Sequence, residues 1–195
     1  MTSKGAETRR RIIEEAARLF NRRGYSGSSL QDVMEATGLE KGGIYRHFSN
    51  KEELAAEAFD HAWNAAFEVR MHDLDDVPDS IGKLKKLVGN FVERRPSVPG
   101  GCPLLNTAID ADDGNALLRE RARKALKSFQ VKIESLVESG VSLREIRHGV
   151  NAREVANTII GALEGALMIA RLERNEDPLR HAQAHLESFI DSLLR

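Results

Sequence analysis

Hydrophobic residues recur every three or four positions along almost the whole chain, with polar residues between them. This period is typical of amphipathic α-helices, whereas half-buried strands alternate every second residue. In the first such segment the apolar stripe consists of Ile12, Ile13, Ala16, Ala17, Leu19 and Phe20. The pattern predicts helices at 7–23, 30–37, 41–48, 52–72, 79–94, 104–112, 115–139, 151–173 and 178–194. Because no segment alternates convincingly as a strand would, the expected fold class is all-α.

Glycine and proline mark the ends of several predicted helices. Gly24 follows the first stripe as a residue typical of helix C-termini, and we expect Tyr25 to fold back onto that helix. The segment 94–103 contains three of the five prolines and two glycines, so it is predicted to be a loop. These breaks separate a short N-terminal group of helices from a longer C-terminal group.

Two segments carry the signature of a capping box. In this motif a serine side chain and an acidic side chain three residues later satisfy the free amides of a helix N-terminus. Ser29 and Asp32 form one such pair before the short second helix. Ser49 and Glu52 form another before the long fourth helix. We therefore expect helices to begin at both places.

Composition narrows the class of protein. Of 195 residues, 30% are charged, 41% hydrophobic and 5% aromatic. The longest apolar stretches are only a few residues, so we expect no membrane-spanning helix and no secretory signal. Cys102 is the single cysteine, which excludes an internal disulfide framework and favours a reducing compartment. These features indicate an intracellular globular protein.

Charge is distributed unevenly along the chain. The net charge is −1, but residues 1–51 contain ten Lys and Arg against six Asp and Glu. The rest of the chain is therefore acidic on balance. A basic first quarter on an acidic body suggests that the N-terminal end meets a polyanion. Ordinary surface charge is the alternative interpretation.

Residues 30–48 fit a helix-turn-helix motif, with a tight turn at Gly38 between two short helices. The second helix begins Lys41-Gly42-Gly43, and each glycine inside a helix costs about 1 kcal/mol relative to alanine. A helix pressed into a DNA groove benefits from such glycines, because bare backbone can approach bases and phosphates closely. On spacing alone, an αα-hairpin in a helical bundle remains the alternative.

The second helix of this motif has an expected inner and outer side. Ile44 and Phe48 are four residues apart and are predicted to point inward. The segment Tyr45-Arg46-His47 is then left nearer the outer side, with Lys41 and Lys51 flanking it. We expect this outer side to face DNA.

The chain resembles the TetR family of bacterial one-component transcriptional regulators over about 45 residues. The resemblance runs through Leu19-Phe20, Gly24-Tyr25, Ser28-Ser29-Leu30, Thr37-Gly38-Leu39-Glu40-Lys41-Gly42-Gly43-Ile44-Tyr45-Arg46-His47-Phe48 and Ser49-Asn50-Lys51-Glu52-Glu53-Leu54. It implies an N-terminal three-helix helix-turn-helix DNA-binding domain at 1–50 and a C-terminal helical effector-binding and dimerisation domain at 51–195. It also implies a bacterial, cytoplasmic protein that has no cofactor.

Particular DNA contacts are implied by the same resemblance. The matching positions are Ser28, Ser29, Lys41, Gly42, Gly43, Tyr45, Arg46, His47 and Lys51. Family members use the position of Tyr45 for a hydroxyl contact and that of Lys51 for a phosphate. Chemistry agrees, since lysine neutralises phosphate and Arg46 suits a bidentate contact to guanine. Two departures are Glu40, in place of a common serine, and Gly43, in place of threonine or alanine.

The last two helices are predicted to form the dimer. Family resemblance assigns them to a four-helix interface between two subunits, and a palindromic operator demands two recognition helices. The candidate interface residues are Val155, Ile159, Gly161, Leu163, Ala166, Phe189, Ile190 and Leu193. For part of each stripe, the alternative is a core within one subunit.

A small-molecule effector of unknown identity is expected to bind among the C-terminal helices. The candidate lining residues are Trp63, Phe67, Phe91, Cys102, Leu105, Phe129 and Met168. Each of them, taken singly, is also an ordinary core residue. Cys102 precedes a predicted helix, whose dipole favours thiolate, so it is also a candidate electrophile sensor. The alternative is a small buried residue beside the helix start.

The function expected from these features is a dimeric repressor that binds a palindromic operator and is released by an effector. A small helical-pocket enzyme and a ligand-independent DNA-binding protein are the rivals. The chain shows no nucleophile elbow, phosphate loop or metal signature, so no catalytic residue or metal ligand is assigned. His181 and His185, four apart, lack a third ligand at firm spacing and are better explained as a solvated face.

Overall fold

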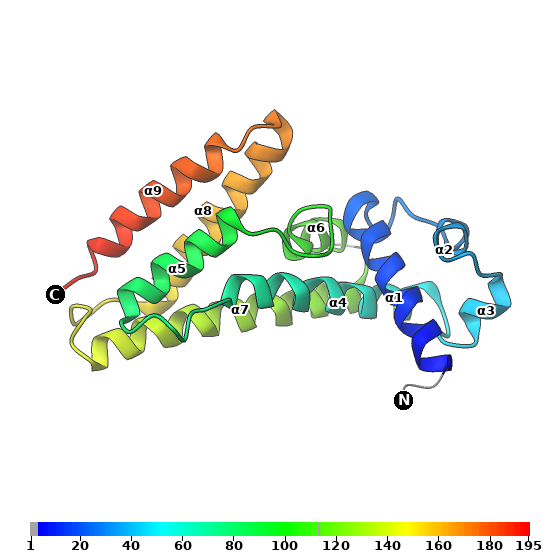
Figure 1. The fold of residues 1–195 in the computed structure, drawn as a ribbon, viewed down its shortest axis with the longest axis horizontal. Coiled ribbons are helices and arrows are strands. Elements are labelled where there is room, and N and C mark those ends of the chain that lie inside the picture. The colour runs from blue at the N-terminus through cyan, green and yellow to red at the C-terminus, as the bar shows by residue number, and fades with distance from the viewer. Residues whose placement is uncertain (1–3, 113) are drawn as a thin grey trace. The chain divides into compact units, whose positions relative to one another are not determined.

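In the computed structural model, residues 4–112 and 114–195 are described, and this part of the chain is helical (Figure 1). The elements are α1 Lys4–Arg23, α2 Leu30–Thr37, α3 Lys41–Tyr45, α4 Lys51–Met71, α5 Ser80–Glu93, α6 Pro103–Asp110, α7 Ala116–Ser142, α8 Ala152–Glu173 and α9 Asp177–Asp191. The only extended pairing among these residues is a single bridge between Ile146 and Leu194. The all-α prediction is therefore confirmed, and each predicted helix is present.

Helix ends differ from prediction where tertiary contacts intervene. The third helix ends at Tyr45 rather than at residue 48. The seventh continues through Gly140, which the sequence had placed in a connector. At Gly140 an added Cβ would lie 2.6 Å from Ile146 Cδ1, so this glycine allows close packing inside the helix instead of ending it.

The predicted capping boxes are both present, one of them in a shifted register. Ser29 caps α2 as predicted, because its hydroxyl accepts the Asp32 amide and Asp32 bonds back to the Ser29 amide. At α4, however, the Asn50 side chain accepts the Glu53 amide, and Glu53 accepts the Ser49 amide. The prediction of Ser49 and Glu52 was therefore wrong by one position, because asparagine caps as well as serine.

The chain divides into two compact units. The first contains residues 1–66 and 96–125, and the second contains residues 67–95 and 126–195. The first unit therefore combines α1 to α3 with α6 and the first parts of α4 and α7. The predicted boundary at residue 50 concerns function and stays a prediction.

The core of the first unit fixes the helix-turn-helix. Apolar side chains from α1 to α4 pack together with Val98 from the loop before α6. Ile44 and Phe48 are 1% and 2% exposed, which confirms that they point inward. The buried members are Ile12, Ala16, Ala17, Val33, Ile44, Phe48, Leu54, Ala58, Ala62 and Val98.

The second unit is built on α8, which packs against α9 and α5. Within the described residues, α8 is the one helix whose length and mean hydropathy, 1.4, suffice for a membrane span, and 44% of that segment is buried in the fold. Glu164 lies buried in its middle, with its Oε1 3.6 Å from Nη2 of Arg70 on α4. A charged group held in this way is typical of a helix that belongs to a protein core.

Candidate nucleic-acid interface

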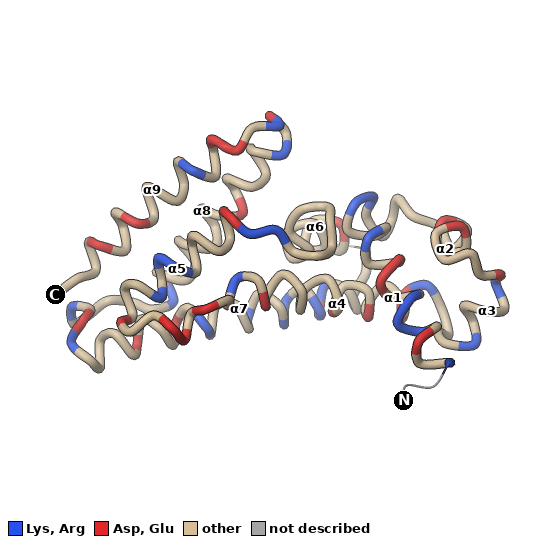
Figure 2. Tube along the Cα trace, viewed as in Figure 1, with Lys and Arg blue, Asp and Glu red and all other residues tan. Residues whose placement is uncertain are grey.

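The surface of α3 presents a small, basic and uncrowded face. Lys41, Gly42, Tyr45 and Arg46 are exposed, and the Lys41 ammonium lies 5.8 Å from the centre of the Tyr45 ring. Figure 2 shows basic residues on both α1 and α3. Aromatic and cationic groups on one short helix suit contacts to phosphates and base edges.

The two glycines of α3 are not required by packing inside the chain. A Cβ added to Gly42 would meet no atom within 4 Å, and one added to Gly43 would lie 3.5 Å from Leu39, an ordinary contact. Alanine would fit both positions and would favour the helix by about 1 kcal/mol at each. Packing within the described residues therefore does not explain these glycines, and their role in close approach to DNA stays a prediction.

Contacts of the buried residue Phe48, just after α3, fix the orientation of this helix. Phe48 is buried and its ring lies 4.9 Å from the Arg9 guanidinium of α1. Arg9 also forms an ion pair with Glu57 of α4. Arg9 therefore connects α1 with Phe48 and with α4. Sequence reasoning missed this role, because a charged residue contributes no signal to the hydrophobic period. His47, another predicted DNA contact, is half-buried.

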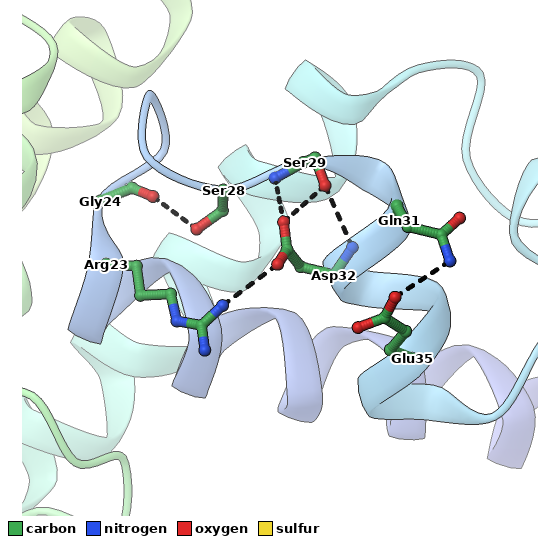
Figure 3. A network of polar contacts seen from close by, with 7 residues as sticks. All are labelled: Arg23, Gly24, Ser28, Ser29, Gln31, Asp32 and Glu35. Atoms are coloured by element: carbon green, nitrogen blue, oxygen red, sulfur yellow. Dashed lines mark hydrogen bonds and ion pairs between the residues drawn. The ribbon is translucent and has the colours of Figure 1, made fainter.

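Figure 3 shows how the predicted serines before α2 are used. The Ser28 side chain is buried, and its hydroxyl donates to the Gly24 carbonyl at 2.8 Å. The exposed Ser29 hydroxyl and amide both bond to Asp32, whose other oxygen accepts from Arg23 at 3.1 Å. In this structure the Ser28 hydroxyl therefore stabilises the loop, so a contact from Ser28 to DNA is not supported by its position.

The carboxylate of Asp32 changes the electrostatics of this corner. Hydrogen bonds from the hydroxyl and amide of Ser29 hold the pKa of Asp32 below its ordinary value. A negative charge at the start of α2 favours the helix dipole but repels a phosphate. Ser29 remains a candidate DNA contact only if its hydroxyl serves the cap and the phosphate together.

Lys51 is already engaged within the chain. Its Nζ donates to the Tyr25 carbonyl at 2.7 Å and lies 4.0 Å from the centre of the Tyr25 ring. Burial lowers the pKa of Lys51, and the carboxylates of Asp110 and Asp32 oppose that shift. An ammonium has three donors, so two are left for a phosphate. Tyr25, which the sequence did not single out as a site residue, sets the position of this lysine.

The predicted effector residues are divided between the two units. Trp63, Cys102 and Leu105 belong to the first unit, and Phe67, Phe91, Phe129 and Met168 belong to the second. Most are buried, but the Met168 side chain is 48% exposed on α8. This exposure in the single chain does not support a place for Met168 in an internal pocket.

The aromatic residues of the second unit surround a charge that the sequence did not predict. The Arg70 guanidinium lies 4.6 Å from the Phe91 ring centre and 5.0 Å from that of Phe129. Phe67 packs edge-on against Phe129. An arginine spaced with the apolar residues of a helix has no signal that marks it as buried, so only the structure identifies it.

The predicted dimer residues are mostly in the subunit's own core. The buried ones are Val155, Ile159, Leu163, Ala166, Ile190 and Leu193. Gly161 is exposed and Phe189 is half-buried. The correction is that these six side chains serve packing within the second unit, and the open apolar face of α8 consists instead of Met168, Ile169 and Leu172. Helical periodicity shows that a stripe is buried, but it does not show against which partner.

Comparison with known proteins gives two family matches. Residues 12–58 match the family of bacterial regulatory proteins named tetR, and residues 80–186 match the tetracyclin repressor-like C-terminal domain. A TetR transcriptional regulator from Chloroflexus aurantiacus J-10-FL is 44% identical, with a TM-score of 0.93 over 98% of both chains. A TetR-family regulator from Cytophaga hutchinsonii is 34% identical, with a TM-score of 0.92 over 100% of this chain and 98% of its own.

One curated relative carries a more specific description. The HTH-type transcriptional repressor DhaR from Mycobacterium sp. strain GP1 is 24% identical over 172 residues, covering 88% of this chain and 86% of the relative. The matched families comprise soluble bacterial regulators, which is consistent with a cytoplasmic location.

Proposed function

Because this chain belongs to the TetR family of helix-turn-helix transcriptional regulators, which are DNA-binding proteins and not enzymes, we propose that it is a dimeric repressor of a palindromic operator. In this proposal a small-molecule effector releases the dimer from DNA in the bacterial cytoplasm. The observation that carries it is the α3 face, where a glycine backbone that packing does not require is flanked by exposed basic and aromatic side chains.

The proposal gives the α3 residues separate roles. Arg46 reads guanine through a bidentate contact, while Lys41 and Lys51 neutralise phosphates. Tyr45, which is 45% exposed, offers its hydroxyl to the DNA backbone and its ring to the groove wall. Gly42 and Gly43 let the helix lie close to the bases. The segment 41–46 is supported by the exposure of most of its residues and by the family to which the chain belongs. Lys51, at the start of α4, is half-buried and is supported by the family match and by its two remaining donors.

The dimer is supported by the free face of α8. A groove of about 680 Å³ runs along α8 and the start of α9. A Cβ added to Gly161 or Gly165 would meet no atom within 4 Å, so a second helix can approach closely there. Met168, Ile169 and Leu172 add exposed apolar area beside it. A palindromic operator has its two half-sites in successive major grooves, about 34–36 Å apart, so its recognition requires two copies of α3.

Repression is supported by the description of DhaR as a repressor. Release by an effector is a two-state proposal: the effector favours a spacing of the two α3 helices that no longer matches the grooves. We infer that the effector site includes Phe91 and Phe129, whose rings face the Arg70 guanidinium, and Phe67, which packs against Phe129.

Selection of duplexes from a random library with the purified full chain tests DNA binding. The affinity of the best duplex is then measured by fluorescence anisotropy over a range of salt concentrations. We expect Lys41→Ala to reduce the salt slope of the dimer by about 1.8, because one phosphate contact, worth about 0.9, is lost in each half-site. We expect Arg46→Ala to lose about 1–3 kcal/mol of discrimination at one base pair of each half-site.

The matched control is Arg123→Ala, which removes an exposed arginine from α7, where it pairs with Glu120. It is expected to leave affinity and slope unchanged. Equal effects of all three variants, or no preferred duplex, would overturn DNA recognition by α3. Sedimentation analysis of the free and bound protein tests the dimer, and a monomer on the best duplex would contradict it.

A further inference from the structure

Tyr25 lies where four elements of the first unit meet. Its amide donates to Asp110 Oδ2, the last residue of α6, at 2.5 Å. Its carbonyl accepts from Lys51 Nζ at the start of α4, at 2.7 Å. The Asn115 side chain accepts the Leu118 amide at the start of α7. Burial raises the pKa of Tyr25, and the nearby Asn115 side chain opposes that shift. Its ring packs edge-on against Phe20 of α1, with centroids 6.1 Å apart.

Gly24 makes this arrangement possible. Its φ of +78° turns the chain out of α1, a conformation that other residues rarely adopt. A Cβ at this position would lie 3.3 Å from Asp110 Oδ2. With glycine there, the Asp110 carboxylate can receive both the Tyr25 amide and, at 3.3 Å, the Ser26 amide. The pair Gly24-Tyr25 therefore ties the end of α1 to the end of α6.

A second set of hydrogen bonds joins α6 to the end of α1. Asn106 of α6 donates to the Asn21 carbonyl at 3.0 Å and to the Gly100 carbonyl at 2.9 Å. Asn21 in turn donates to the Pro99 carbonyl at 3.0 Å. The cavity beside these residues is only about 30 Å³, room for one water-sized molecule. These hydrogen bonds therefore connect α6 to α1, and the cavity beside them is too small for an effector.

Among the residues that contact Tyr25, Lys51 is the one that binds DNA in the proposed function. Its ammonium is held by one hydrogen bond and by the face of the Tyr25 ring, and it keeps two donors. A lysine side chain otherwise has four rotatable bonds to immobilise before it can hold a phosphate. Tyr25 removes much of that freedom before DNA arrives.

We propose that Tyr25 is a positioning residue that holds Lys51 for its phosphate and makes this contact depend on the corner where α6 ends and α7 begins. The proposal rests on the proposed contact between Lys51 and DNA. In this proposal Asp110 and Asn115 do not touch DNA, and they influence the position of Lys51 through Tyr25. A displacement of that corner withdraws Lys51 even when α3 itself is unchanged.

A double-mutant cycle on operator affinity tests the proposal with the full-length protein and the selected duplex. The variants are Asp110→Asn, Lys51→Ala and the two combined. We expect Asp110→Asn to weaken binding by about threefold to tenfold, the usual range for directly coupled residues. In the Lys51→Ala background the same substitution is expected to change affinity by less than about twofold.

Two further variants separate positioning from general effects. Tyr25→Leu keeps the backbone carbonyl but removes the ring that faces the Lys51 ammonium, and it is expected to weaken binding in the same Lys51-dependent way. Asp112→Asn is the matched control, because Asp112 is exposed, lies two residues beyond Asp110 and has no contact with Tyr25. It makes the same change of charge, so it reports the purely electrostatic effect on DNA affinity.

The salt slope distinguishes the outcomes. If the inference holds, Asp110→Asn reduces the slope of the dimer by about 1.8, as Lys51→Ala does, because both variants lose one phosphate contact in each half-site. Equal weakening by Asp110→Asn in both backgrounds, with the slope unchanged, would show a merely structural role and overturn the inference while leaving DNA binding intact. If Lys51→Ala changes neither affinity nor slope, the Lys51 contact itself fails and the inference falls with it.

Discussion

The buried ion pair between Arg70 and Glu164 allows a quantitative prediction about stability. The two side chains are about 5% and 10% exposed, and their nearest charged atoms are 3.6 Å apart. At an effective dielectric constant of about 20, opposite charges at this distance attract by about 4–5 kcal/mol. Removing one partner leaves the other charge buried, which typically costs about 3–5 kcal/mol. We therefore expect Glu164→Gln to lower the free energy of unfolding by about 3 kcal/mol or more.

The double substitution Arg70→Met and Glu164→Leu has a different expected result. It removes both desolvated charges and fills the space between Phe91 and Phe129 with apolar atoms, which is often neutral or stabilising. It also loses the interaction of the guanidinium with the two rings, worth up to about 2 kcal/mol when desolvated. We expect the double variant to recover most of the stability lost by either single variant.

Urea unfolding followed by circular dichroism measures these differences. All variants are compared at one protein concentration, because the stability of a dimer depends on concentration. Arg70→Met alone is the second arm of the cycle. A double variant whose loss equals the sum of the two single losses would refute the reasoning, since it would show that the two charges do not act as a pair.

Four further predictions follow from local geometry. Gly24→Ala forces a side chain into a φ of +78° and toward Asp110, so we expect a loss of about 1–2 kcal/mol in thermal unfolding; an unchanged melting temperature would contradict it. Ser29→Ala removes the α2 cap and is expected to cost about 1 kcal/mol. Hydrogen bonds from Ser29 lower the folded pKa of Asp32, so the part of the cap that depends on this carboxylate is complete above the unfolded pKa and is lost as pH falls through the folded pKa. The stability difference between the variant and the wild type should therefore narrow in acid, and the bond from the Asp32 amide to the Ser29 hydroxyl accounts for what remains. Cys102 is 3% exposed, so a quinone should label it far more slowly in the folded protein than in urea, and equal rates would argue for the sensor role. Leu172→Glu places a charge on the exposed face of α8 and should dissociate the dimer in sedimentation experiments, while Leu143→Glu, at another exposed apolar position, serves as its control.

Much of the helix-turn-helix could be predicted from local sequence rules. The bounds of α2, its capping box and the inward direction of Ile44 and Phe48 were all predicted, because spacing and capping chemistry act within a few residues. The shift from Ser49 to Asn50 at the start of α4 shows the limit of such rules. Two neighbouring residues with equal capping ability cannot be ranked without the backbone.

Long-range features escaped sequence reasoning for a different reason. The apolar stripe through Ile159 and Leu163 was correctly identified as buried, but its partner is the same chain. Asp110 and Tyr25 are 85 positions apart, and no periodicity relates them. The burial of Arg70 could not be predicted from the sequence, because the aromatic rings that its guanidinium contacts come from two other helices.

The bare backbone of α3 has a consequence for how this kind of regulator diversifies. Since Gly42 faces open space and Gly43 has room for a methyl group, new side chains can be added there without disturbing the fold. Such additions even raise helix propensity. In the proposed function a methyl group at either position would alter the approach to DNA without a cost to folding, so target preference can change there independently of stability.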